Sequence, residues 1–376
     1  MVTQASSLDE FSDIAPYADA ELPERLLALC SDPELLDAAC ALRFKIATNF
    51  LKPFVRPLVR SRLKREVSKI KDRATWHEMM VHFIESMLET TTDGFTYSGI
   101  ESIPRDRPCV FISNHRDITL DPVLVNYSLW LNGHPTCKIA IGDNLLDLRV
   151  GAEFMRINDS FVVVRNAPGL KAQYAAMSKT SRYIRYVLGQ GQSVWIAQRE
   201  GRSKDGADRT DPAVLKMFAL AYREQSKDIN HMLEQFNLVP TTLTYELDPC
   251  ATRKAMELAE RERTGNYVKS EHEDRDSLVQ GIRGFKGRVH VAYGHPMDAQ
   301  YRDADELAQA IDVTMTENRR SYPTFLAARD VLNGNFVTLE QGRVKEEFST
   351  QWQSLEGRER ELLLQQYANQ ARDQAS

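Results

Sequence analysis

A histidine and two aspartates follow an apolar segment in the stretch FISNHRDITLD, residues 111–121. If that segment is a strand ending at Ser113 and a helix begins near Pro122, then His115 and Asp121 belong to one tight loop. A carboxylate in such a loop can hold one imidazole nitrogen and leave the other as a general base. The competing interpretation is a histidine bound by the backbone and an aspartate that caps the helix, and it is the more common one for an isolated pair.

Two further apolar segments end in cations. FVVVRN brings Arg165 to the end of one, and WIAQREGRSKDG ends in a highly charged loop. That loop contains Arg199, Glu200, Gly201, Arg202, Ser203 and Lys204. Loops with glycine and several cations suit phosphate, because guanidinium groups match its oxygens, although a single arginine is more often part of a surface ion pair. Three polar strand ends together favour a site, since ligands of open α/β sheets gather there. The sequence contains no nucleophile elbow, Walker loop, dinucleotide fingerprint or zinc motif.

Alternating strand and helix patterns predict the scaffold that positions these loops. Strands are expected within residues 94–103, 108–114, 137–143, 159–166, 193–198, 238–247 and 287–297. Helices are expected within residues 120–133, 170–191 and 213–225. This alternation predicts an α/β domain with a mixed, partly parallel sheet flanked by helices.

Both ends of the chain have helical patterns. We therefore expect an N-terminal helical region over residues 1–92, the α/β domain over 93–302, and a C-terminal helical region over 303–376. The tail is rich in Glu, Gln and Arg, and it is expected to form a solvated helix with a frayed end.

A basic segment stands out against the net charge of −5. Residues 43–73 contain eleven Lys or Arg against two acids, a net charge of +9, so the rest of the chain carries −14. Apolar residues are interleaved with these cations, which suits an anionic lipid surface. A solvated helix that covers a core explains the pattern equally well. Nucleic acid is a weaker candidate, because the chain lacks a module of stacking aromatics and its other surface is acidic.

Composition indicates an ordinary globular protein of the reducing cytosol. No run of eighteen apolar residues occurs, and the N-terminus lacks the basic and apolar regions of a secretory signal. The five cysteines are scattered, which argues against a disulfide framework or a zinc site. We expect a cytoplasmic protein, with a peripheral position on the cytoplasmic face of a membrane as the variant that the basic segment suggests.

Four motifs resemble, in order, those of the glycerolipid acyltransferase superfamily, which includes glycerol-3-phosphate and 1-acylglycerol-3-phosphate acyltransferases. They are SNHRDITLD, FVVVRN, REGRSKDG and LVPTTLTYE, and the resemblance covers roughly residues 95 to 300. It implies a fold like that of the glycerol-3-phosphate acyltransferases. It also implies transfer of a fatty acyl group from acyl-CoA or acyl carrier protein to a hydroxyl group of 1-acylglycerol-3-phosphate or glycerol-3-phosphate, without a metal, a cofactor or a covalent acyl-enzyme.

The resemblance also implies roles for single residues. His115 and Asp121 would be the catalytic pair, in which His115 removes the proton of the acceptor hydroxyl. Substrate would be bound by residues of the four motifs, namely Asn114, Arg116, Arg165, Glu200, Gly201, Arg202, Ser203, Lys204 and Pro240.

Two departures from the family pattern leave alternatives open. Asp121 stands six positions after His115 rather than five, so Asp117 is a rival partner, although the segment after Asp121 continues into a helix as in the family. The third motif is one residue shorter than Glu-Gly-Thr-Arg-Ser, which affects the pose expected for Arg202. The alternative function is a non-catalytic protein that binds membrane surfaces on a degenerate acyltransferase scaffold.

Overall fold

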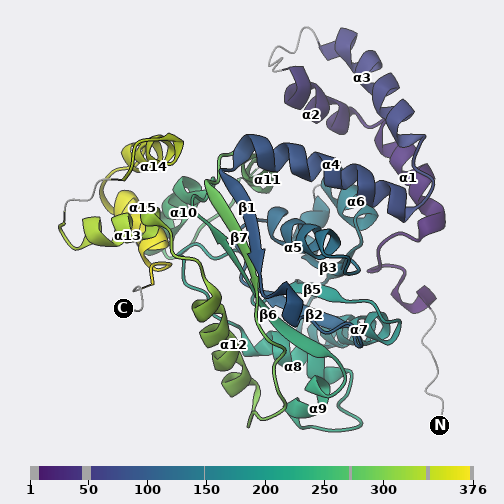
Figure 1. The fold of residues 1–376 in the computed structure, drawn as a ribbon. Coiled ribbons are helices and arrows are strands. Elements are labelled where there is room, and N and C mark those ends of the chain that lie inside the picture. The colour runs from purple at the N-terminus through teal and green to yellow at the C-terminus, as the bar shows by residue number, and fades with distance from the viewer. Residues whose placement is uncertain (1–7, 45–51, 148, 271–272, 336–338, 373–376) are drawn as a thin grey trace. The chain divides into compact units, whose positions relative to one another are not determined.

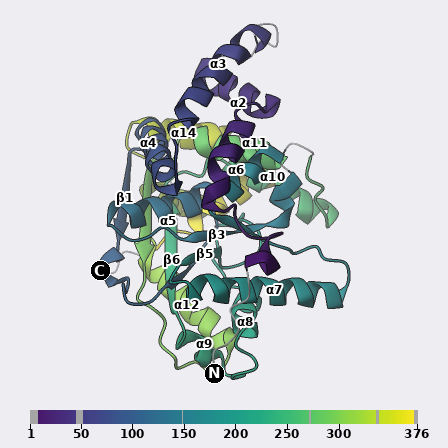
Figure 2. The ribbon, with the colours of Figure 1, turned by 90° about the vertical axis from the view of Figure 1, so that its right-hand side faces the viewer.

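A computed structural model describes residues 8–44, 52–147, 149–270, 273–335 and 339–372 of the chain (Figure 1 and Figure 2). The chain folds into two compact units, and each unit is formed by two separate segments of the sequence. Unit 1 contains Met1–Ile84 and Lys138–Thr180, and unit 2 contains Glu85–Cys137 and Ser181–Ser376. The boundaries expected after residues 92 and 302 divide the chain in sequence order instead, and they stay a prediction.

Unit 2 contains five strands in the order β1-β7-β6-β2-β5. Their bounds are β1 Gly94–Ser98, β2 Cys109–Ser113, β5 Val194–Ala197, β6 Asn237–Tyr245 and β7 Arg288–Tyr293. β6 and β7 pair antiparallel, while β1–β7, β6–β2 and β2–β5 are parallel. In unit 1, β3 (Lys138–Gly142) pairs parallel with β4 (Ser160–Val163). The predicted mixed, partly parallel sheet is confirmed, and each predicted strand segment overlaps one of these strands.

The strands next to the candidate site are buried along their whole length. Every residue of β2, β5 and β6 is buried, which explains why β2 and β5 are runs of mainly apolar residues rather than alternating patterns, while β6 also buries three threonines. Helix α5 (Leu120–Leu131) packs on β7 and α12 (Ala304–Asn318) packs on β6. In Figure 1 these two helices lie on opposite sides of the strands, so the strand ends emerge between helical layers.

Further helical elements belong to unit 2. They are α8 Pro212–Leu220, α9 Ile229–Leu233, α10 Ala251–Thr264, α11 Glu273–Arg283, α13 Pro323–Leu332, α14 Arg343–Gln353 and α15 Gly357–Ala368, with the short η3 Ile100–Ser102 after β1. Helix α15 packs on α10 and α13 around a core that includes Phe325, Leu363 and Tyr367. The prediction of a solvated C-terminal helix is therefore wrong. Helix α15 has an apolar stripe between its charged residues, and α10 and α13 cover this stripe. The composition of the tail alone does not show that these two helices pack against it.

Unit 1 contains the N-terminal helices. Its elements are η1 Leu8–Phe11, η2 Asp19–Glu21, α1 Leu22–Leu29, α2 Pro33–Phe44, α3 Lys52–Val67, η4 Asp143–Asp147 and α6 Arg149–Ile157. Helices α4 (Arg73–Thr91) and α7 (Leu170–Gly189) contain residues of both units. One core of unit 1 joins α1, the end of α3 and α6, and it includes Leu22, Val67 and Ile157.

A buried group of charges, here called the Asp159 cluster, lies in unit 1. Asp159 contacts Arg73 at 3.2 Å, His77 at 3.2 Å and Lys138 at 2.5 Å. Burial alone raises the pKa of Asp159, but these three partners outweigh it and lower the pKa to about 2. The cluster ties α4 to the strand β3, so it has a structural role within this unit.

Candidate active site

Three parallel strands bring three of the four predicted motifs to one edge of the unit 2 sheet. Strand β2 pairs with β5 on one side and β6 on the other, and Ser113 lies opposite Ala197 and Thr241. Because the carboxyl ends of parallel strands meet at the same edge, the segments that follow β2, β5 and Thr241 in β6 must lie close together.

His115 and Asp121 meet in the loop after β2. Nδ1 of His115 lies 2.8 Å from Oδ2 of Asp121, and the two side chains are 17% and 0% exposed. Because an ionised carboxylate can only accept, Nδ1 carries the proton and Nε2 keeps its lone pair. No described residue is hydrogen-bonded to Nε2. Nε2 can therefore act as a base toward a substrate on the partly exposed side of the imidazole ring.

Asp121 is held in place by its surroundings. It lies in the first turn of α5, where the positive end of the helix dipole favours a carboxylate. Its Oδ2 also accepts from the backbone N–H groups of Arg116, at 2.6 Å, and Asp117, at 3.0 Å. The hydroxyl group of Tyr245, the last residue of β6, donates to Oδ1 at 2.8 Å. Tyr245 was not among the predicted site residues.

Asp117, the rival partner, makes different contacts. Its Oδ1 accepts from the N–H groups of Thr119, at 2.9 Å, and Leu120, at 2.8 Å, where α5 begins. Burial and the neighbouring Asp121 carboxylate raise the pKa of Asp117. Helix α11 comes so close at Gly281 that a Cβ atom there would lie 2.0 Å from Oδ2 of Asp117. Asp121 is thus the hydrogen-bond partner of His115, and the extra loop residue is absorbed by the turn that Asp117 stabilises.

The loop after β5 contacts His115 directly. The N–H of Ser203 donates to the His115 carbonyl at 2.7 Å, and the N–H of Gln198 donates to Ser113 at 2.7 Å. Gly201 allows the turn between these contacts because its φ of +73° is costly for other residues. Arg202, adjacent to Ser203, consequently lies beside the histidine loop, and its charge acts on Asp117.

Arg116 binds the two loops together. Its guanidinium group donates to Oγ of Ser203 at 3.0 Å, to the Gly206 carbonyl at 3.0 Å and to Asp208 at 2.8 Å. Asp208 also pairs with Arg319 at 2.7 Å, and its side chain is 1% exposed. Arg116 and Ser203 are buried in these contacts, so their role in this geometry is to hold the loops. Direct contact of either with a substrate stays a prediction.

Asn114 and Pro240 also lie inside the protein. The side chain of Asn114 accepts from the Leu243 N–H at 2.8 Å and donates to the Leu243 carbonyl at 2.9 Å, which fixes the loop to β6. Pro240 is opposite Ile112 within the sheet. The positions of both residues explain the shape of the site, while their predicted substrate contacts stay untested.

The predicted phosphate-binding cations fall into different environments. Lys204 lies 3.0 Å from Glu257 of α10, and burial lowers the pKa of Lys204 while Glu257 opposes that effect. Glu200 is exposed on the same loop. Arg165 follows β4 in unit 1, where its N–H donates to Asp143 at 3.1 Å. That Arg165 lines the same site as His115 stays a prediction.

A buried lysine, Lys254, is hydrogen-bonded to the backbone of the histidine loop. Nζ of Lys254, on α10, donates to the Arg116 carbonyl at 2.7 Å and pairs with Asp248 at 2.5 Å. Lys254 is 3% exposed. It was not predicted, because α10 carries so many charges in sequence that it resembles a solvated helix.

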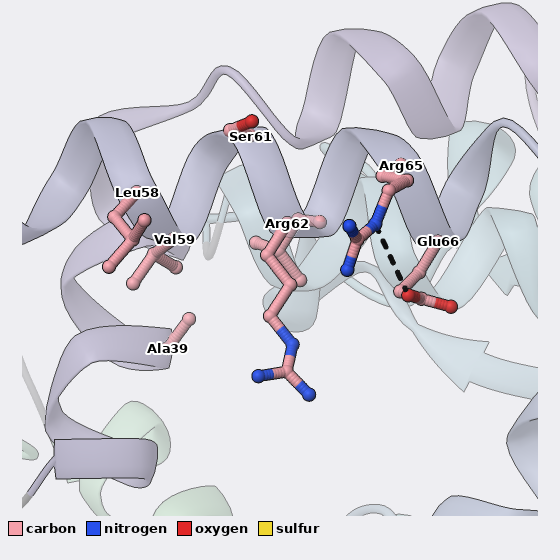
Figure 3. A pocket seen from close by; sticks show the side chains of 8 residues that line it. Ala39, Leu58, Val59, Ser61, Arg62, Arg65 and Glu66 are labelled. Carbon is pink, nitrogen blue, oxygen red and sulfur yellow. Dashed lines mark ion pairs between the residues drawn. The ribbon is translucent and has the colours of Figure 1, made fainter.

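The basic segment forms part of a second surface, in unit 1. Helices α2 and α3 lie side by side, and a hollow along them is lined by Ala39, Leu58, Val59, Ser61, Arg62, Leu63, Arg65 and Glu66 (Figure 3). Val59 packs against Leu36 and Cys40 of α2, so the apolar residues of α3 largely serve a protein core. Arg60, Arg62 and Arg65 are exposed, and Leu58 is 68% exposed. Residues 45–51 of the predicted basic segment lie outside the described residues.

Arg56 is less available than these cations. Its guanidinium group makes a bidentate contact with Asp37 of α2 at 2.6 and 2.7 Å, which joins the two helices. Within the described residues, no helix is both long enough and apolar enough to cross a membrane.

Comparisons with known proteins identify a family model and similar solved structures. A family model described as Acyltransferase matches residues 94–237. Curated protein sequences show no significant match to the chain. Among solved structures, the 1-acyl-sn-glycerophosphate (LPA) acyltransferase PlsC from Thermotoga maritima is 15% identical, with a TM-score of 0.37. That alignment covers 84% of this chain and 100% of the PlsC chain.

Proposed function

We propose that the chain is an acyltransferase, and the match of residues 94–237 to the Acyltransferase family model, which contains three of the four sequence motifs and ends where the fourth begins, supports this. The chain transfers a fatty acyl group from an acyl thioester, acyl-CoA or acyl carrier protein, to a hydroxyl group of a phosphorylated glycerol. The leading acceptor is 1-acylglycerol-3-phosphate, and glycerol-3-phosphate is the alternative. The observation that carries this proposal is the bond between Nδ1 of His115 and Asp121, which leaves Nε2 as a base beside a cationic loop.

The proposed step is a direct acyl transfer. Nε2 of His115 takes the proton of the acceptor hydroxyl while its oxygen attacks the thioester carbonyl, so a C–O bond forms and the C–S bond breaks. The leaving sulfur then takes the proton from Nε2. Asp121 stabilises the imidazolium that exists between these two events, as the aspartate of a catalytic triad does. The reaction as proposed requires neither a metal nor a cofactor beyond the acyl donor.

Arg202 is the proposed phosphate-binding residue of unit 2. It lies next to Ser203, whose backbone contacts His115, whereas Lys204 is already paired with Glu257. Arg202→Gln should therefore raise the KM for the acceptor with little change in kcat, since phosphate held equally in the ground and transition states is uniform binding. Arg209→Gln is the matched control, because Arg209 on the same loop is 67% exposed and pairs with Asp205.

Acceptor-dependent thiol release tests the function. Purified protein is mixed with acyl-CoA or acyl carrier protein, and free thiol is measured with 1-acylglycerol-3-phosphate, with glycerol-3-phosphate, with unphosphorylated monoacylglycerol or with no acceptor. The proposal predicts release that requires a phosphorylated acceptor. Thiol release that no acceptor changes, or none at all, would contradict it and favour the non-catalytic alternative.

We also propose that the exposed cations of α3 contact anionic lipid, which would place the enzyme at a membrane surface on the cytoplasmic side. Support comes from the exposure of Arg60, Arg62 and Arg65, while the packing of Val59 indicates an electrostatic contact without insertion of the helix. Each cation near such a surface contributes roughly 1 kcal/mol, and less at high salt.

Vesicle sedimentation tests this contact. Changing Arg60, Arg62 and Arg65 together to Glu should abolish binding to phosphatidylglycerol vesicles at low salt. The control reverses Arg263, Arg275 and Arg302 of unit 2, which are 72%, 48% and 84% exposed, and so changes the net charge equally. Equal loss in both triple variants would show a net-charge effect, and unchanged binding in the α3 variant would rule the surface out.

A further inference from the structure

We propose that Tyr245 is a positioning residue of the His115–Asp121 pair: its hydroxyl group fixes the Asp121 carboxylate and, through it, the orientation of His115. The catalytic meaning of this inference rests on the proposed function, but the contacts that carry it do not depend on any substrate. Tyr245 ends β6, and Asp121 lies in the first turn of α5, 124 positions earlier in the chain. The hydroxyl group thus links two elements that meet at the site.

The two oxygens of Asp121 have different partners. Oδ2 accepts from Nδ1 of His115 and from the Arg116 and Asp117 N–H groups, while Oδ1 accepts from Tyr245 at 2.8 Å. Because Asp121 is fully buried, water cannot readily replace a lost donor. Bonds to both oxygens define the plane of the carboxylate, and that plane sets the direction in which His115 can donate.

Tyr245 keeps its proton throughout the working range of the site. Burial and the carboxylates of Asp121 and Asp117 raise the pKa of Tyr245 well above its usual value. The hydroxyl group therefore acts as a constant donor that stabilises the charged form of Asp121. Without it, more of the negative charge of Asp121 would be directed at the imidazolium form of His115, which that charge stabilises.

Other charges near the pair do not obscure this effect. They are Arg116 and Asp117 of the same loop, Arg202 after β5, Asp248 after β6, Lys254 of α10 and Lys286 before β7. A Tyr245→Phe substitution leaves all of them in place and removes a single oxygen atom. The change in the His115 titration thus reports on the hydroxyl group itself.

Tyr245→Phe is compared with Tyr293→Phe. Tyr293 is also buried, and its hydroxyl group bonds to Ser128 at 2.7 Å and to the Val125 carbonyl at 3.2 Å, away from Asp121. Both variants lose a buried hydroxyl, so both should lose some thermal stability. Only Tyr245→Phe should shift the histidine NMR titration of His115, assigned with His115→Ala, upward by about half a unit. The acid limb of kcat/KM should move in the same direction, and kcat/KM near neutral pH should fall about tenfold.

The outcomes separate this inference from the proposed function. A folded Tyr245→Phe protein with an unshifted His115 titration overturns the positioning role, as does an equal shift in Tyr293→Phe. If the titration shifts only in Tyr245→Phe but the unmodified protein shows no acceptor-dependent thiol release, the positioning role stands and the proposed function fails. If the unmodified protein is active and the titration is unshifted, the function stands and the positioning role fails.

Discussion

Asp121→Asn removes the charge beside His115 and keeps the shape of the side chain. The amide can place its oxygen where Oδ2 lies and still accept from Nδ1 of His115 and from the Arg116 and Asp117 N–H groups. Its NH2 group then faces the hydroxyl of Tyr245, which can rotate and accept. We therefore expect the variant to fold and to keep the same tautomer of His115.

The variant should nevertheless be a poor catalyst. Nδ1 and Oδ2 are 2.8 Å apart, so the charge centres of an imidazolium and a carboxylate lie close together. Unit charges at about 4 Å attract each other by about 4 kcal/mol at an effective dielectric constant of 20. Loss of most of that attraction predicts a fall in kcat of about 10²- to 10³-fold. The acid limb of the pH profile should move to lower pH, because the imidazolium form of His115 is less stable once the neighbouring negative charge is gone.

Asp117→Asn is the matched control for this prediction. Its amide oxygen can still accept from the Thr119 and Leu120 N–H groups, and the exchange removes a carboxylate whose ionisation burial already opposes. Thiol release should stay within a few-fold of the unmodified protein. The reasoning is refuted if Asp117→Asn is the inactive variant and Asp121→Asn works normally.

Three further predictions concern stability. Asp208→Ala leaves the two buried guanidinium groups of Arg116 and Arg319 without their shared carboxylate. The free energy of unfolding measured with urea should therefore fall by roughly 3 to 5 kcal/mol. A fall below about 1 kcal/mol would show that Asp208 does not hold the loops. Gly281→Ala pushes a methyl group against Asp117 and should lower the unfolding free energy by roughly 1 to 3 kcal/mol, while Gly189→Ala, with open space around it, should be neutral. In the Asp159 cluster the pKa of the carboxyl is depressed in the folded state, so its stabilisation, on the order of 2 kcal/mol, is present above about pH 4 and lost as pH falls toward 2. Asp159→Asn should thus reduce stability at pH 7 but no longer at pH 2, and an equal loss at both would contradict this assignment.

The strands β2 and β5 could be predicted from sequence because they are apolar runs between polar loops, even though their neighbours in the sheet are unknown. Strand β6 is less apolar, and its Val and Thr residues, which favour strands, identify it instead. The apolar run of β2 also places the histidine loop at a strand end. What it could not decide was which aspartate pairs with His115, because the choice depends on Asp117 taking the backbone N–H groups at the start of α5.

Residues that act on the site from distant elements were missed. Tyr245 is 124 positions from Asp121, and nothing local to β6 indicates that the two meet. A tyrosine at the polar end of a buried strand is nevertheless a usable signal, since a buried phenol needs a hydrogen-bond partner. Lys254 gave no signal, because a lysine in a charged helix is normally solvated.

Arg116 illustrates a different difficulty of predicting from sequence, which is that a charged residue in a motif can be buried in a structural ion pair. A cation next to the proposed base suggests a substrate contact, yet its side chain is 6% exposed and paired with Asp208. Asp208 belongs to a loop more than ninety positions away, so the burial of Arg116 is a tertiary property. Charge in a motif predicts where a site lies more reliably than which of its cations reach the ligand.

The central claim is that His115 is the general base of an acyltransferase, and His115→Ala tests it most directly. The control is His134→Ala, which removes another partly buried loop histidine of unit 2. With both proteins shown to be folded by circular dichroism and thermal melting, acceptor-dependent thiol release is measured at saturating acyl donor. The account predicts a fall of roughly 10²- to 10⁴-fold for His115→Ala and near-normal rates for His134→Ala. A folded His115→Ala protein with full activity would contradict it.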